Sequence, residues 1–245
     1  MKPLPFILSE TDDWAVVIKD HGMPTAPLKE GEQGTLLSWF LEHYPSCSAV
    51  YGKKNIERGL LHRLDTDTSG CVLIAKNQSA YDYLVQAQDK GQFIKRYRAL
   101  CNAQPLPGFP RSPVQIPQGS SLNLAITSLF RPWGPGRKAV RPVFTKDCRG
   151  ECSSKVYTTL LESLEKTHTG TDESFLAQCV LTHGFRHQIR CHLASIGYPI
   201  SGDRLYNDKP GDGPLCLWAY ELTFPDPTTE KKVCVSFQLP DKMSQ

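Results

Sequence analysis

Apolar residues along the chain fall mostly into short runs, which predict strands. Trp14–Ile18 and Cys71–Ala75 are almost uninterrupted apolar runs and are typical of buried strands. Phe93–Leu100 alternates instead, so its odd-numbered and even-numbered residues face opposite sides of a predicted strand. Further strands are predicted at residues 122–130, 155–161, 175–181, 215–224 and 233–239.

Three segments show the apolar spacing of a helix: Thr35–Tyr44, Gln78–Gln88 and Arg186–Ile196. Pro45 ends the first, and Gly197 closes the third. The middle third is dense in proline, glycine and serine at residues 104–120 and 131–142, and we expect β-ribbon and loop there. Many strands and few helices, without strict βαβ alternation, predict an α+β fold with a mixed but mainly antiparallel central sheet and flanking helices and loops.

Composition adds limits to this picture. The chain has 245 residues, 40% of them hydrophobic and 22% charged, which is ordinary for a globular protein with a substantial core. The net charge of +3 is compatible with a nucleic-acid partner but does not demand one. Nine cysteines without a C-x-x-C pair favour reduced thiols. Neither a signal peptide nor a stretch of about 20 apolar residues is found, so we expect a cytoplasmic protein that makes no contact with membranes.

The segment Gly59–Gly70 brings together His62, Arg63, Asp65 and Asp67 just before a predicted core strand. Charged groups placed at the end of a strand are held on a rigid scaffold, which suits a functional site. The Asp, Thr, Ser and Gly residues of this segment are equally suited to a plain turn. Residue types alone favour the turn.

A second cluster lies on the alternating strand. Lys95 and Tyr97 share one face, and Arg96 and Arg98 share the other. A tyrosine flanked by cations could stack against a nucleobase. The alternative is an ordinary amphipathic strand whose lysine and arginines lie in water, and this is favoured when the strand is considered alone.

The third cluster is the predicted helix Arg186–Ile196. Helical spacing places Arg186 one turn before Arg190, and because like charges at this spacing repel, we expect an acidic partner. His183, His187 and His192 raise the question of a metal site. Their spacing does not match H-E-x-x-H and no carboxylate lies within the run, so we expect no metal.

In order along the chain, these segments resemble the RluA-type pseudouridine synthases. The signature H-R-L-D-x-x-T-S-G matches residues 62–70 without gaps. The family's K-x-Y-x-A strand matches at Lys95, Tyr97 and Ala99. Its helix motif G-x-x-H-Q-[IL]-R-x-H and the following G-x-P-I-x-G-D-x-x-Y match within residues 184–192 and 197–206. The resemblance covers residues 12–239, and it changes the preferred interpretation of Asp65 from a turn residue to a catalytic one.

Three positions depart from the family pattern. Lys19-Asp20-His21-Gly22 stands where K-P-x-G is common, Phe185-Arg186 replaces the usual order before His187, and Trp218 replaces a common histidine. These departures affect expected substrate contacts and leave Asp65, Tyr97 and Arg190 unchanged. The resemblance implies a pseudouridine synthase fold, with one catalytic domain over residues 1–245 and no S4-type RNA-binding domain.

The resemblance also implies a reaction and its residues. A uridine in ribosomal or transfer RNA would be isomerised to pseudouridine without metal or cofactor. The oligomeric state does not follow from the sequence, and a monomer is the default expectation. Asp65 is expected as the nucleophile, or as the base that opens the sugar, with Arg190 as its guanidinium partner. Tyr97 would lie against the flipped base, and Arg63 would fill the place that the base vacates. His62 is expected to support the loop, and the remaining substrate-binding residues are expected to be Arg186, His187 and Gln188.

Two further points stay open at this stage. Arg131, Arg137, Lys138 and Arg141 form a basic stretch that is predicted to contact RNA phosphates, but it could equally be a solvated loop. The alternatives to the enzyme are an RNA-binding protein that has lost catalysis and an unrelated hydrolase that uses Asp65. The intact catalytic residues argue against the first, and the missing glycine-rich phosphate loop argues against the second.

Overall fold

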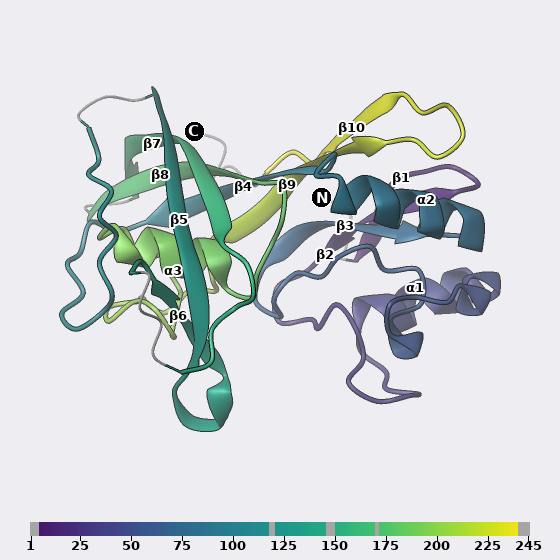
Figure 1. Ribbon diagram of the computed structural model, residues 1–245, viewed down its shortest axis with the longest axis horizontal. Helices are drawn as coiled ribbons and strands as arrows, with labels where there is room; N and C mark the ends of the chain where they lie inside the picture. The colour runs from purple at the N-terminus through teal and green to yellow at the C-terminus, as the bar shows by residue number, and fades with distance from the viewer. Residues whose placement is uncertain (1–4, 118–120, 146–149, 170–171, 240–245) are drawn as a thin grey trace. The chain divides into compact units, whose positions relative to one another are not determined.

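The computed structural model describes residues 5–117, 121–145, 150–169 and 172–239, and its chain forms two compact units (Figure 1). Unit 1 comprises Met1–Lys95 and Trp218–Gln238, and unit 2 comprises Arg96–Leu217 and Leu239–Gln245. Strands predominate in both units, and the described residues form ten strands and three α-helices. The predicted α+β class is confirmed.

Unit 1 contains five neighbouring strands and two helices. Their bounds are β1 Phe6–Glu10, β2 Trp14–Lys19, β3 Ser69–Ala75, β9 Leu217–Pro225, β10 Lys232–Ser236, α1 Leu36–His43 and α2 Gln78–Asp89. The strands lie in the order β1-β2-β3-β9-β10. Only the pairing of β3 with β9 is parallel, and the other three are antiparallel. The sheet of unit 1 is therefore mixed, with β2 and β3 at its centre.

The core of unit 1 explains why β2 and β3 read as continuous apolar runs. Every residue of both strands is buried. Val16 and Ile18 pack in one cluster with Leu73 and with Leu84 of α2, while Val17 faces the other side of the sheet and is also fully buried. A strand covered on both faces needs apolar residues at every position, so it shows no alternation.

Unit 2 is built on five strands and one helix. Their bounds are β4 Ile94–Cys101, which begins at the end of unit 1, β5 Ser121–Trp133, β6 Ala139–Val143, β7 Tyr157–Thr169, β8 Asp172–Leu181 and α3 Gln188–Ser195. The strands lie in the order β4-β8-β7-β5-β6. Strands β5 to β8 pair antiparallel, and α3 contacts β6 and β7.

The proline-rich stretch at 131–142 forms a β-ribbon, as predicted. Strand β5 continues to Trp133, and β6 begins at Ala139 after a short 3₁₀ turn at Pro135–Arg137. The two strands form a hairpin in which Gly134 and Gly136 both have positive φ. Glycine and proline therefore serve the tight turn, and the flanking residues pair as strands.

Two other expectations need correction. Helix α3 begins at Gln188, because His187 has a left-handed backbone (φ 56°) that a helix cannot continue through, so Arg186 is not stacked over Arg190 on one helix. Cys152 is disulfide-bonded, so the reduced-thiol interpretation is wrong there; it lies in the β6–β7 loop, outside the packed strands. The other seven described cysteines are not disulfide-bonded. Strand β1 was not predicted.

None of the described helices is long and apolar enough to cross a membrane.

The turn between β9 and β10 generates a stability prediction. Asp226 accepts a hydrogen bond from the indole Nε1 of buried Trp14 at 2.8 Å and three more from Thr228 and Thr229. These bonds, the one from Trp14 first, lower the pKa of Asp226 below its ordinary 3.8. Asp226→Ala would leave the indole donor buried without a partner, so we expect the free energy of unfolding at pH 7 to fall by about 1–3 kcal/mol.

Urea unfolding of the two proteins measures this difference, with Asp12→Ala, an exposed carboxylate, as control. Because the folded pKa is the lower one, the stabilisation is present above pH 4 and the gap between wild type and variant should narrow as the pH falls below it. Equal losses for both variants would contradict the assignment.

Candidate functional site

Asp65 lies in a tight turn immediately before β3. The backbone N–H of Thr68 donates to the carbonyl of Asp65 at 3.0 Å, which closes the turn. Asp65 is half-buried, whereas Asp67 is exposed. Arg63 is also exposed and pairs with Glu57 at 3.1 Å. The turn that residue types favoured is therefore present, and it presents Asp65 and Asp67 in different environments.

Two buried side chains hold the backbone on either side of Asp65. The hydroxyl of Thr25 donates to the carbonyl of Leu64 at 2.8 Å and accepts from the N–H of Leu64 at 3.1 Å. The ammonium of Lys19 donates to the carbonyl of Thr66 at 2.9 Å. The backbone of residues 64 and 66 is thus held by buried side chains, so the position of Asp65 between them is set by the core of unit 1.

Lys19 also supplies positive charge beneath the turn. Its side chain is completely buried, and it donates to the carbonyls of Asp20 and Met23 as well. Burial lowers the pKa of Lys19 to about 8, and the charges of Asp20, Asp65 and Asp67 oppose this shift. The lysine of the family's K-P-x-G motif is retained here, and the proline that follows it is replaced by Asp20.

Gly70 ends the motif because β3 approaches β9 very closely there. Its φ is +124°, and a Cβ atom would lie 2.2 Å from the carbonyl oxygen of Ala219. A side chain at position 70 would break the parallel pairing of Gly70 with Ala219 and of Ser69 with Trp218. Trp218, the departure from the family's histidine, stacks on Phe237, with ring centroids 5.9 Å apart.

His62 is held beside β3 in its neutral form. Its Nε2 accepts from the N–H of Leu73 at 3.3 Å, which leaves the proton on Nδ1. Burial, and then the charge of Lys95, lower the pKa of His62 well below its ordinary value. Nδ1 is buried and has no hydrogen-bond partner among the described residues. The ring therefore braces the segment that carries Asp65, and it keeps one donor that a ligand could use.

The strand β4 buries the face that carries Lys95 and Tyr97. Both side chains are buried, while Arg96 and Arg98 are half-buried. The alternative in which Lys95 lies in water is wrong. Burial lowers the pKa of Lys95 to about 8, and no carboxylate of the described residues pairs with it. Burial of an unpaired lysine costs free energy of folding, so Lys95 is a candidate for a functional role. The sequence had placed Lys95 in a motif without assigning it a role.

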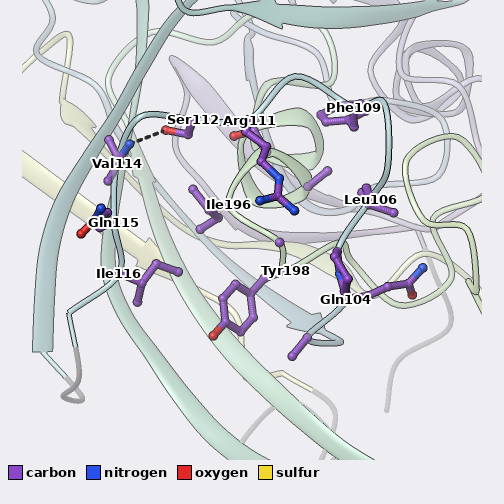
Figure 2. Close-up of a pocket in the computed structure, with 15 residues that line it drawn as sticks. Gln104, Leu106, Phe109, Arg111, Ser112, Val114, Gln115, Ile116, Ile196 and Tyr198 are labelled. Carbon is purple, nitrogen blue, oxygen red and sulfur yellow. Dashed lines mark hydrogen bonds between the residues drawn. The ribbon is translucent and has the colours of Figure 1, made fainter.

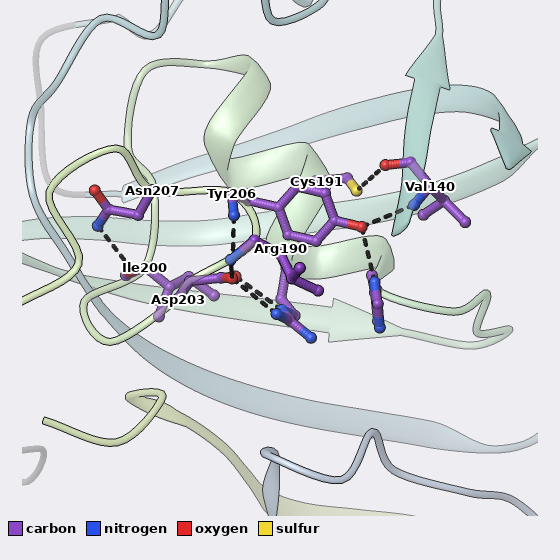
Figure 3. Close-up of polar contacts among 9 residues, drawn as sticks. Val140, Arg190, Cys191, Ile200, Asp203, Tyr206 and Asn207 are labelled. Carbon is purple, nitrogen blue, oxygen red and sulfur yellow. Dashed lines mark hydrogen bonds and ion pairs between the residues drawn. The ribbon is translucent and has the colours of Figure 1, made fainter. Parts of the chain in front are cut away.

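Arg190 on α3 forms a buried ion pair (Figure 3). Its Nε and Nη2 donate to the two carboxylate oxygens of Asp203 at 2.8 and 2.7 Å. Asp203 also accepts from the N–H groups of Leu205 and Tyr206. The acidic partner expected for this helix is therefore Asp203. The pairing of Arg190 with Asp65, which lies in unit 1, stays a prediction, as does the contact of Tyr97 with a flipped base.

Tyr206 connects three segments of unit 2. Its hydroxyl accepts from the N–H of Val140 on β6 at 2.9 Å and lies 2.7 Å from Nδ1 of His187 (Figure 3). Burial raises the pKa of Tyr206 far above its ordinary value. His187, predicted to bind substrate, thus contacts the tyrosine of the next motif just before α3 begins.

The other motif residues of α3 are buried polar groups with partners. Gln188 donates to the carbonyl of Thr158 and the hydroxyl of Thr159, and His192 lies between the hydroxyls of Thr159 and Ser128. Burial lowers the pKa of His192 to about 3, so it is neutral. In the described part of the chain no three His, Cys, Asp or Glu side chains are grouped as metal ligands. The two hydrogen bonds of Gln188 to Thr158 and Thr159 fix α3 to β7.

Arg186 lies apart from this buried network. It is exposed, and its Nη2 donates to the carbonyls of Arg137 and Ala139 at 2.9 and 3.2 Å, at the end of the β5–β6 hairpin. Of the three residues predicted to bind substrate near α3, only Arg186 is on the surface.

A separate pocket of about 540 Å³ lies in unit 2 between the loop after β4 and the end of α3 (Figure 2). Gln104, Phe109 and Arg111 come from the loop, and Ile196 and Tyr198 follow the helix. None of the predicted site residues lines it.

The unpaired lysine generates a pH prediction. Its folded pKa of about 8 lies below the ordinary 10.5, so the unfolded chain binds the extra proton between these values and stability should rise with pH there. Lys95→Met removes a buried charge, so we expect the free energy of unfolding at pH 7 to rise by about 2–3 kcal/mol and the rise between pH 8 and 10.5 to shrink.

Urea unfolding at several pH values measures both effects, and Lys29→Met, at an exposed loop position, should show neither. A destabilised Lys95→Met protein would mean that the ammonium has a stabilising partner.

The buried ion pair generates a second prediction. Asp203→Asn leaves the Arg190 guanidinium buried without its countercharge, so we expect a loss of about 3–5 kcal/mol in the free energy of unfolding. The double variant Arg190→Met/Asp203→Leu should lose less than the single variant, since it buries no charge. Asp208→Asn, at an exposed position nearby, is the control. Chemical unfolding of the four proteins tests the pair, and a loss below about 1 kcal/mol for Asp203→Asn would contradict it.

Comparison with known proteins agrees with this geometry. The family model described as RNA pseudouridylate synthase matches residues 13–195. An RNA pseudouridine synthase of Aquifex aeolicus, described as uncharacterized, is 30% identical over 246 residues, which are 96% of this chain and 69% of the relative. Ribosomal large subunit pseudouridine synthase D of Neisseria meningitidis is 26% identical over 96% of this chain and 58% of its own length.

Solved structures show the same fold. Human RNA pseudouridylate synthase domain containing 1 superposes with a TM-score of 0.70 at 21% identity, over 99% of this chain and 89% of that one. Human RNA pseudouridylate synthase domain containing 4 gives a TM-score of 0.62 at 18% identity, over 97% and 89%. The predicted pseudouridine synthase fold is confirmed. With three quarters of its length matched by the family model, the chain belongs to the RNA pseudouridylate synthase family.

Proposed function

We propose that this enzyme converts a specific uridine of ribosomal or transfer RNA to pseudouridine, with Asp65 as its nucleophile and with the target base flipped out of the RNA. The family makes it an isomerase that acts on RNA. Three of the relatives that it matches are named for the large ribosomal subunit, which supports ribosomal RNA as the first substrate to test.

The presentation of Asp65 carries this proposal. Leu64 and Thr66 are held from the core by Thr25 and Lys19, so the carboxylate between them has a defined position. It is half-buried, and it interacts electrostatically with the buried ammonium group of Lys19. Asp67, two residues on, is exposed.

The reaction needs no group beyond the protein and its substrate. The bond from C1′ to N1 of uracil breaks, and a bond from C1′ to C5 forms. The C5 proton is lost and N1 gains one, so atoms and charge balance without oxidant or reductant. In our proposal the Asp65 carboxylate attacks C1′ and expels uracil at N1, and Tyr97 lies against the base while it turns. C5 of the base then displaces Asp65 from C1′, so the bond between the enzyme and the sugar is broken again.

The roles of the neighbouring residues follow from their exposure. Arg63 is exposed and lies two residues before Asp65. Its ion pair with Glu57 is partly exposed, so Arg63 can leave this pair and enter the space left by the flipped base. Burial lowers the pKa of His62 well below its ordinary value, and its Nε2 accepts from the N–H of Leu73, so we assign His62 to positioning the loop.

Replacement of the carboxylate tests the proposal directly. Asp65→Asn keeps the size of the side chain and removes the nucleophile, so we expect pseudouridine formation to fall by at least about a thousandfold. Asp67→Asn is the matched control and should keep most of the activity. Ribosomal and transfer RNA that lack the modification are incubated with each protein, and pseudouridine is mapped by primer extension after carbodiimide treatment.

Three outcomes are informative. Equal pseudouridine signal from wild type and Asp65→Asn would reject Asp65 as nucleophile. Loss of pseudouridine formation in Asp67→Asn alone would assign Asp67 as the nucleophile instead. No new site with wild type, in either RNA, would favour the RNA-binding protein that has lost catalysis.

A further inference from the structure

The β5–β6 hairpin has one buried face and one exposed face. Phe130 and Val140 point inward and pack against α3. The register pairs Arg131 with Arg141 across the strands, and because side chains alternate, Trp133 shares the outer face with both arginines. The outer face therefore carries two cations directly opposite each other and an aromatic ring one step nearer the turn.

The three outer side chains contact one another. The guanidinium carbon of Arg141 lies 4.0 Å from the centre of the Trp133 ring, and that of Arg131 lies 5.0 Å from it. Arg141 also donates to the carbonyl of Gly108 at 3.1 Å and lies 5.5 Å from the ring of Phe109. The indole is nevertheless 40% exposed, so part of its surface is open to a ligand.

This arrangement is unfavourable for the protein alone. Like charges directly opposite each other in an antiparallel pair destabilise it. Neither Arg131 nor Arg141 forms an ion pair with a carboxylate of the described residues. Nε of Arg131 is buried and lacks a hydrogen-bond partner in the described part of the chain. The charge of Arg131, after burial, lowers the pKa of Arg141. An anionic ligand bound to the outer face would offset the repulsion between the two guanidinium groups.

The aromatic ring narrows the class of ligand. Two guanidinium groups alone would suit any phosphate or carboxylate. An exposed indole beside them suits a ligand that joins a flat ring to negative charge, which describes a nucleotide whose base is unpaired. Around the hairpin turn, Lys138 is exposed, whereas Arg137 is paired with Glu151, so the positive charge is concentrated at the arginine pair.

We propose that Arg131, Trp133 and Arg141 form a stacking site for an unpaired nucleotide of bound RNA. The base lies on the open part of the indole, and the two guanidinium groups donate to the adjacent phosphates. The site rests on the proposed function only in that RNA is the substrate. It assigns to the hairpin a recognition role for single-stranded segments, which a purely phosphate-binding loop would lack.

Removal of the bases from the ligand tests the stacking. The probes are a fluorescein-labelled 12-mer of uridylate and an abasic ribose-phosphate 12-mer, which has the same charge and no bases. We expect Trp133→Ala to bind the uridylate about tenfold more weakly by fluorescence anisotropy and to bind the abasic strand like wild type. Trp133→Phe should retain most of the uridylate affinity. Tyr51→Ala, which removes an exposed aromatic elsewhere, is the control.

The arginines are separated from the tryptophan by salt dependence. Arg131→Gln and Arg141→Gln should weaken binding of both strands, and each should reduce the slope of log affinity against log salt by about 0.7. Trp133→Ala should leave that slope unchanged. Lys232→Gln removes one exposed charge from unit 1 and is the control for net charge. Circular dichroism melting shows whether each variant is folded.

Several results would overturn the stacking site. One is equal affinity of wild type for the two strands, and another is equal loss on both strands in Trp133→Ala. Displacement of uridylate by an equal concentration of a 12-residue polyglutamate would assign the surface to an acidic protein instead. Base-dependent binding without pseudouridine formation would contradict the proposed reaction and still support the stacking site. Pseudouridine formation with base-independent binding would contradict the stacking site alone.

Discussion

One buried ammonium group organises the turn that carries Asp65. Lys19 ends β2, and its three hydrogen bonds draw together the end of that strand, the loop at Met23 and the carbonyl of Thr66. Burying this charge is expensive, as its lowered pKa of about 8 shows. An apolar side chain would cost less but could not satisfy three carbonyls. Desolvation of Lys19 thus costs free energy in unit 1, and in return the backbone around Asp65 is fixed. Lys19 also places positive charge near the carboxylates of Asp65 and Asp67.

In unit 2, buried polar groups with partners fix the position of a helix. Helix α3 is buried along its whole length, although half of its residues are polar. Arg190, Gln188 and His192 each find a partner on a different segment, so the helix can occupy one position only. A buried polar group with no partner costs about 1–3 kcal/mol, and this makes the network selective for a single arrangement. Motif residues that look chemical in the sequence, Gln188 and His192, thereby turn out to hold the helix in place.

The parts of the fold that sequence reasoning could predict are those in which local pattern and core agree. Strands β2 and β3 and helices α1 and α2 all followed from their apolar spacing. Residue types around Asp65 predicted only a turn, and the catalytic role expected for Asp65 came from the resemblance to the family. The start of α3 could not be foreseen, because nothing in the identity of His187 signals a left-handed backbone. At 131–142 the sequence predicted β-ribbon and loop, and the prolines, which an edge strand tolerates, hid the bounds of the two strands. Lys19 and Asp203 act through contacts distant in sequence, which no local pattern records.

The parallel pairing of β3 with β9 has a consequence for how the protein is made. Ser69 and Gly70 pair with Trp218 and Ala219, so unit 1 is assembled from two stretches of chain that are separated by Arg96–Leu217 of unit 2. On the ribosome, the residues around Asp65 emerge long before the strand that flanks them. Unit 2 is contiguous between Arg96 and Leu217 and can fold as it emerges. The framework beside the Asp65 turn is completed only when β9 has been synthesised, so a nascent chain would acquire activity late, after most of its length is already structured.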